Sequence, residues 1–131
     1  MKTELCRDDF GTINHDRERD LLELDWSERT ASMTDDDVKA WLERYTEFGE
    51  KHRPAFMLID ARRFRHPFGA ELASWREKHI IPRYNAAGVR KLAFLLPKEF
   101  VPGTQPAPEA GATFSTGYFD TPAKVSEWFG S

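Results

Sequence analysis

Four basic side chains gather in a short segment that follows an apolar run and one acidic residue. They are Arg62, Arg63, Arg65 and His66, and the acidic residue is Asp60. Ligands of open α/β sheets lie outside the carboxyl ends of the strands, and the N-terminus of the next helix favours anions. The segment therefore predicts a site for a phosphate, a carboxylate or the acidic surface of a protein partner. The competing interpretation is a solvated basic loop that pairs with acidic residues elsewhere in the chain.

Asp60 and His66 also permit a catalytic hypothesis. A carboxylate or imidazole within reach of a substrate can act as a general base, and the arginines can stabilise an oxyanion. The sequence offers no other support for catalysis, because it lacks a nucleophile elbow, a P-loop and a dinucleotide-binding glycine motif. An aspartate at the end of a strand more often caps a loop or the next helix. We therefore expect a protein that is not an enzyme.

Histidine and cysteine give no sign of a metal centre. The four histidines share no metal-ligand spacing. Cys6 is the single cysteine, which excludes an intramolecular disulfide and an all-cysteine metal site. We expect no metal, no cofactor and a reducing, cytoplasmic location.

Charge and hydropathy argue against nucleic acids and membranes as partners. The chain of 131 residues, the size of one domain, has 22 acidic and 19 basic residues and a net charge of -3. Nucleic-acid binders normally carry a basic excess. No run approaches the roughly 18 consecutive apolar residues that a membrane-spanning helix needs. Residues 1–9 mix both signs of charge, unlike a signal peptide.

Alternating strands and helices would position the basic segment. Hydrophobic periodicity and turn residues predict strands over 3–7, 11–15, 20–26, 55–60, 90–96 and 112–119 and helices that begin near residues 34, 67 and 122. Residues 1–18 form a peripheral strand region, and residues 97–111, rich in proline and glycine, form an exposed loop with one helical turn near 99–101. This order predicts an α/β fold with a mostly parallel sheet and an N-terminal antiparallel hairpin.

Three segments share a pattern of apolar residues and turn residues with a known family: Phe56–Arg62, Val89–Leu95 and Tyr118–Phe129, together with the helix that carries Trp75. Through them the C-terminal two-thirds of the chain resemble the SpoIIAA-like group of the wider STAS and SEC14-type domains. This resemblance implies a four- to five-stranded sheet with helices packed mainly on one face. Classical STAS antagonists of anti-sigma factors carry an Asp-Ser-Ser-Gly-type motif where the helix after the central strand begins, and a serine of that motif is phosphorylated. Residues 62–70 contain no hydroxyl group here, so the resemblance carries over no phosphoserine switch and no functional residue.

We predict one SpoIIAA-like domain over residues 1–131. It would be a non-catalytic interaction module that binds a protein partner or a small anionic ligand at Asp60, Arg62, Arg63, Arg65 and His66. The resemblance implies a bacterial regulatory context. A homodimer through an edge strand or a helix face is a further expectation, because unpaired edge strands invite pairing.

A hydrophobic-ligand domain is the alternative. Helices over 34–51 and 68–81 would flank an apolar pocket, in the place where SEC14-type relatives bind lipids or other hydrophobic ligands. Against this, Trp41, Tyr45, Trp75 and Trp128 have the spacing of core residues on amphipathic helices. A chain this short is also expected to have little volume left once its core is filled.

Overall fold

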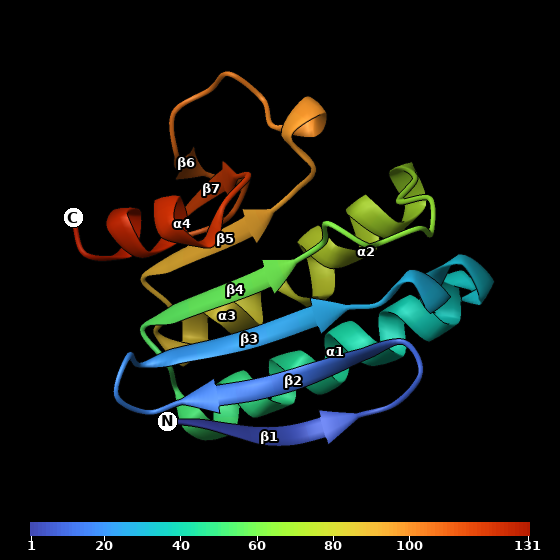
Figure 1. Cartoon of the computed structure of the whole chain (residues 1–131), viewed down its shortest axis with the longest axis horizontal. Helices are drawn as coiled ribbons and strands as arrows, with labels where there is room; N and C mark the ends of the chain where they lie inside the picture. The colour runs from blue at the N-terminus through green and yellow to red at the C-terminus, as the bar shows by residue number, and fades with distance from the viewer.

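The computed structural model describes residues 1–131 and contains one seven-stranded sheet. Helices lie on both faces of this sheet (Figure 1). The strand order is β1-β2-β3-β4-β5-β7-β6. The strands are β1 (Lys2–Arg7), β2 (Gly11–Asp16), β3 (Leu21–Trp26), β4 (Phe56–Asp60), β5 (Lys91–Leu95), β6 (Ala107–Pro108) and β7 (Ser115–Phe119). The helices are α1 (Asp35–His52), α2 (Ala70–His79), α3 (Ile81–Ala87) and α4 (Pro122–Phe129), with short 3-10 helices η1 (Glu28–Ser32) and η2 (Lys98–Phe100). None of them is long and apolar enough to cross a membrane.

The sheet is mixed, which confirms the α/β class but differs from the predicted sheet of four or five mostly parallel strands. The pairs β3–β4, β4–β5 and β5–β7 are parallel, and the pairs β1–β2, β2–β3 and β6–β7 are antiparallel. The antiparallel pair β2–β3 is the N-terminal hairpin that the sequence predicts. Two further antiparallel pairs arise because β1 folds back onto β2 and because Ala107–Pro108 adds a short edge strand. The turn between β2 and β3 uses Asp20 at φ 52°, a left-handed conformation that aspartate tolerates better than most residues.

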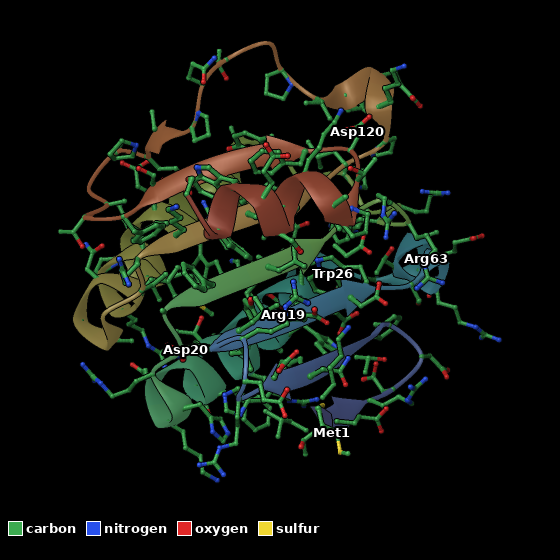
Figure 2. The ribbon with its side chains drawn as sticks, turned by 60° about the vertical axis from the view of Figure 1, so that its left-hand side comes forward. Met1, Arg19, Asp20, Trp26, Arg63 and Asp120 are labelled. Carbon is green, nitrogen blue, oxygen red and sulfur yellow. The ribbon has the colours of Figure 1, made fainter.

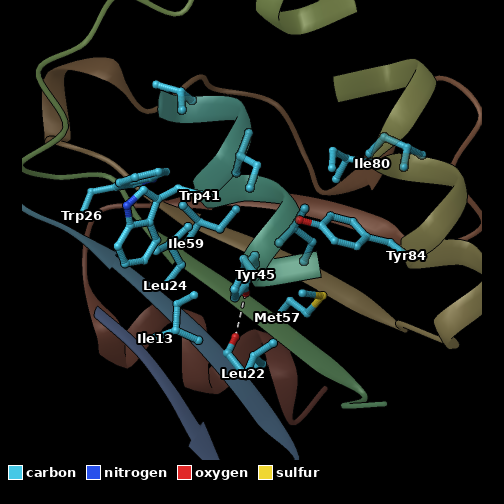
Figure 3. Close-up of a cluster of buried hydrophobic side chains, with 14 of the residues drawn as sticks. Ile13, Leu22, Leu24, Trp26, Trp41, Tyr45, Met57, Ile59, Ile80 and Tyr84 are labelled. Atoms are coloured by element: carbon cyan, nitrogen blue, oxygen red, sulfur yellow. Dashed lines mark hydrogen bonds between the residues drawn. The ribbon is translucent and has the colours of Figure 1, made fainter. Parts of the chain in front are cut away.

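Successive side chains of a strand point to opposite faces of the sheet, so the sheet has a hydrophobic core on each face. On β3, Leu22, Leu24 and Trp26 are buried on the face covered by α1, α2 and α3, whereas Leu21 belongs to the separate core under α4. Tyr45 connects helix α1 to the sheet, because its hydroxyl lies 2.8 Å from the carbonyl oxygen of Leu22 (Figure 3) and 3.2 Å from that of Leu58. The strand predicted over residues 20–26 is confirmed as β3.

Helix α1 begins and ends as its sequence predicts. Thr34 accepts a hydrogen bond from the Asp37 amide, and the Asp37 carboxylate accepts one from the Thr34 amide, which completes a capping box. The helix ends at Arg53, whose backbone is left-handed with φ 48°, and Pro54 follows. Three aspartates in the first turn add a favourable interaction with the helix dipole.

Thr34→Ala is expected to lower the free energy of unfolding by about 1 kcal/mol, because the amide of Asp37 loses its side-chain acceptor. Urea denaturation measures this directly. Ser74→Ala is the matched control, since Ser74 is an exposed hydroxyl residue within α2, and we expect it to change stability by less than about 0.5 kcal/mol. Equal effects of the two substitutions would contradict the role of the cap.

The region predicted as one helix from Pro67 toward Ile80 is shorter and divided. Helix α2 begins only at Ala70, and the chain bends at Ile80 before α3, which has Pro82 in its first turn. Phe68 therefore lies outside the helix and is 44% exposed. Leu72 is the only buried residue of α2, so this helix packs less closely than α1.

Helix α4 lies on the opposite face from the other three helices and covers β5 and β7 (Figure 1). Val125 and Phe129 are the buried residues of this helix, and the ring of Phe129 stacks on Phe56 of β4 at 4.7 Å. Strands β1 and β2 remain uncovered on this face (Figure 1). Asn14 of β2 pairs in register with Glu23 of β3, so polar side chains lie side by side there. The helices are thus packed mainly, but not entirely, on one face.

Candidate functional site

An apolar pocket opens at the carboxyl ends of the central strands, between the sheet and helices α1 and α2. Its volume is about 350 Å³, and ten of its 11 lining residues are hydrophobic. The lining consists of Trp26, Val38, Leu42, Ile59, Ala61, Phe64, Phe68, Arg76, Phe94, Leu96 and Tyr118. Phe68 and Tyr118 are the most exposed hydrophobic members, at 44% and 36%, so they mark the opening toward solvent.

Aromatic side chains account for five of the 11 residues that line the pocket. Trp26 contacts Phe64 with ring centroids 5.1 Å apart, and Phe94 stacks on Tyr118 at 5.5 Å with an interplanar angle of 14°. Trp26 also packs against Trp41 in the core behind the pocket, at 5.8 Å (Figure 3). The pocket remains open because α2 contributes one buried apolar side chain, Leu72, and Ala61 is small.

Arg76 is the one charged residue of the pocket lining. Its guanidinium donates two hydrogen bonds to the Glu109 carboxylate, at 2.6 and 3.0 Å, and lies 5.5 Å from the centre of the Phe94 ring. The side chains of Arg76 and Glu109 are 12% and 24% exposed. Glu109 also accepts a hydrogen bond from the Thr116 hydroxyl at 2.7 Å. The pair therefore joins α2 to the long loop that precedes β7.

Both members of this pair stay ionised. Burial acts to raise the pKa of Glu109, but the hydrogen bonds and charge of Arg76 outweigh it and hold that pKa below its ordinary value. Burial likewise acts to lower the pKa of Arg76, and Glu109 raises it beyond its ordinary value. Burial, with a contribution from Glu109, raises the pKa of Tyr118, so this phenol stays protonated at neutral pH.

Asp60 and the first two arginines of the predicted anion site lie away from the apolar pocket. The Asp60 carboxylate accepts hydrogen bonds from the Arg62 guanidinium at 3.0 and 2.7 Å and from the Arg62 amide at 3.2 Å. Arg63 forms an ion pair with Asp25 at 3.3 Å, at the same end of the sheet as Trp26 (Figure 2). Both guanidinium groups are thus already matched by carboxylates of the chain.

The remaining two residues of the predicted site point elsewhere. The imidazole of His66 lies 2.6 Å from the Asp35 carboxylate in the first turn of α1, and its side chain is 10% exposed. The Arg65 amide donates to the Thr30 hydroxyl at 2.8 Å, whereas its guanidinium reaches only the Arg62 carbonyl, at 3.4 Å. Asp60 and His66 each bind a partner of their own, so the structure does not join them as an acid–base pair.

A second hollow, of about 270 Å³, lies on the opposite face between α4 and strands β3 and β4. Asp60 and Arg62 line it together with Arg19, which donates to the Ser126 hydroxyl at 2.7 Å and is labelled in Figure 2. Lys2 pairs with Glu23 at 2.8 Å in the same hollow. Its charges are of both signs and largely paired within the chain.

Sequence reasoning placed a pocket between the first two long helices as an alternative but expected too little volume for it. The volume that is present contradicts that expectation. Glu109 was not singled out at all, because it lies in a proline-rich loop that resembles any exposed connection. The scarcity of large apolar residues in Ala70-Glu71-Leu72-Ala73-Ser74 was the available signal for an incompletely filled space under α2.

No family model, no curated protein and no solved structure matches this chain. The fold and the site alone define its class, an α/β domain with an apolar, aromatic-walled pocket at the carboxyl edge of its sheet. No group of three or more histidine, cysteine, aspartate or glutamate side chains is placed to hold a metal ion.

Proposed function

We propose that this chain is a non-catalytic binding module whose ligand is a small, mostly apolar molecule held in the aromatic pocket. The pocket of about 350 Å³ with ten hydrophobic lining residues is the observation that carries the proposal. Sites for small molecules typically measure about 300–1,000 Å³ and are lined mainly by apolar and aromatic side chains. An engineered apolar cavity of about 150 Å³ already suffices to bind benzene.

The position of the pocket supports a ligand more than it supports a packing defect. It lies at the carboxyl edge of parallel strands β3, β4, β5 and β7, where open α/β sheets bind their ligands. Its opening is flanked by Phe68 and Tyr118, two large side chains left partly in water. A ligand that covers them would remove apolar surface from solvent, at about 25 cal/mol per Å².

An anion-binding or protein-binding module remains the second candidate. Arg65 supports it, because its guanidinium is exposed and has no carboxylate partner in the chain. Arg62, Arg63 and His66 support it less, since Asp60, Asp25 and Asp35 already balance them. Titration with inorganic phosphate separates the candidates: saturable binding that Arg65→Ala abolishes would favour the anion module.

The SpoIIAA-like relationship, the cytoplasmic location and the bacterial regulatory context belong to the same proposal. The order of α1, β4, α2 and β5 and the placement of three helices on one face support the relationship. A homodimer through the sheet edges has little support, because β1 is charged at Lys2, Glu4 and Arg7 and is interrupted by a bulge. The other edge, β6, has two residues, one of them Pro108.

The experiment is a titration with N-phenyl-1-naphthylamine, a neutral probe that fluoresces in apolar surroundings. We expect saturable binding to the wild type and an affinity at least about tenfold weaker for Ala61→Phe, which fills the pocket. Leu96→Trp fills the same space from the position that follows β5 and should act alike. Phe100→Ala is the control, because Phe100 is an exposed phenylalanine outside the pocket lining.

Thermal unfolding of each variant keeps this test interpretable. Loss of probe binding in both filled variants, at unfolding midpoints close to that of the wild type, would support the pocket as the site. Equal binding by wild type and both filled variants would overturn the proposal, since the probe would then occupy another surface.

A further inference from the structure

We infer that the ligand is a planar aromatic molecule with an uncharged hydrogen-bond acceptor at its edge, such as a ring ketone or aryl ketone, and that Arg76 donates to that acceptor. This inference rests on the proposed function and specifies its ligand. The aromatic walls of the pocket and the hydrogen bonds of the Arg76 guanidinium support it.

The walls favour a flat ring. Trp26, Phe64, Phe94 and Tyr118 are ring side chains in the pocket lining, and they contact one another in pairs at 5.1 and 5.5 Å. Aromatic rings attract a further ring in offset-stacked or edge-to-face geometry beyond the benefit of burial alone. A flexible aliphatic chain would obtain the burial without this added attraction.

Arg76 supplies unused hydrogen-bond donors. A guanidinium has five N–H groups, and those of Arg76 make two hydrogen bonds, both to Glu109. Its side chain lines the pocket and is 12% exposed, and none of its nitrogen atoms is both buried and without a partner. The donors that Glu109 does not use are therefore free to bind a ligand. An acceptor that replaces water at these donors forms a charge-assisted hydrogen bond, which is stronger than one between neutral groups.

Because of Glu109, the site favours an uncharged acceptor on the ligand over an anionic one. The Glu109 carboxylate already balances the charge of Arg76, with contacts of 2.6 and 3.0 Å, and Thr116 donates to it as well. A ligand carboxylate on the same guanidinium would bring a second negative charge next to Glu109 in surroundings of low dielectric. Like charges this close disfavour the ionised forms. A carbonyl oxygen accepts the hydrogen bond without that repulsion.

The experiment measures displacement of N-phenyl-1-naphthylamine by three matched compounds: 2-acetylnaphthalene, 2-ethylnaphthalene and naphthalene-2-carboxylate. We expect the ketone to bind the wild type at least about tenfold more tightly than the ethyl compound, as one charge-assisted hydrogen bond allows. The carboxylate should bind more weakly than the ketone. In Arg76→Lys and in the double variant Arg76→Met with Glu109→Leu, the ratio of ketone to ethyl affinity should fall toward one.

Arg83→Lys is the matched control. Arg83 forms a bidentate pair of the same kind with Glu50, at 3.0 and 2.7 Å, and lies outside the pocket lining. Its substitution should therefore leave the ratio of ketone to ethyl affinity unchanged. Equal affinities of ketone and ethyl compound for the wild type, or tightest binding of the carboxylate, would overturn the inference and leave the proposed function standing. Failure of the wild type to bind the probe or any of the three compounds would overturn both.

Discussion

Glu109→Ala is expected to lower the free energy of unfolding by about 3 kcal/mol, because it leaves the guanidinium of Arg76 buried without its counterion. The substitution also removes the acceptor of the Thr116 hydroxyl. Since Glu109 is the residue through which the loop before β7 holds α2, the pocket wall should loosen together with the loss of stability. Urea denaturation followed by circular dichroism measures the change.

Glu50→Ala provides the control for this prediction. Glu50 binds Arg83 with comparable distances, but the two side chains are 43% and 31% exposed, and pairs at the surface contribute about 1 kcal/mol or less. The double variant Arg76→Met with Glu109→Leu should recover much of the lost stability, because an apolar pair of similar volume avoids the unpaired charge. A loss from Glu109→Ala no larger than that from Glu50→Ala would show that water solvates Arg76 after all.

The same ion pair predicts a dependence of stability on pH. The pKa of Glu109 is lower in the folded protein than its ordinary value of 4.5. Its contribution is therefore fully present above that ordinary value and is lost as the pH falls toward and through the lower folded value. Glu109→Ala should thus flatten part of the decline in stability of the wild type between about pH 5 and pH 3.

Local patterns predicted the elements that build the site. Strand β3 was predicted from the alternation of Leu22, Leu24 and Trp26 with charged residues, and the same alternation indicated its buried face. Thr34 before three aspartates fixed the start of α1. Phe68 was misplaced in a helix because its apolar character fitted the spacing to Leu72, although the chain at Gly69 is still extended. Propensity alone could not set that boundary.

The site depended on contacts that no local pattern contains. The basic segment was visible from residue types, but its partners Asp25 and Asp35 lie 38 and 31 positions away from Arg63 and His66. Glu109 lies 33 positions from Arg76. The pocket is a volume left between α2 and the sheet, and unfilled space follows from the packing of the whole chain.

Phe129→Ala is expected to lower the free energy of unfolding by about 4 kcal/mol, the cost of removing a large buried ring and leaving a cavity. Phe129 is 8% exposed and stacks on Phe56 at 4.7 Å. It belongs to a core of six buried residues under α4 that is separate from the larger core on the other face. A core this small has few neighbours that can move inward to fill the space.

Other contacts should not hold α4 in place once this ring is gone. Lys91 donates to the Trp128 carbonyl at 2.6 Å, but a hydrogen bond of this kind contributes only about 1 kcal/mol net. Phe100→Ala, at a phenylalanine that is 68% exposed, is the control and should change stability by less than about 0.5 kcal/mol. Because the apolar pocket lies on the opposite face, Phe129→Ala should still bind N-phenyl-1-naphthylamine under conditions where it remains folded. A loss of probe binding as large as that in Ala61→Phe would instead show that the two faces of the sheet are coupled.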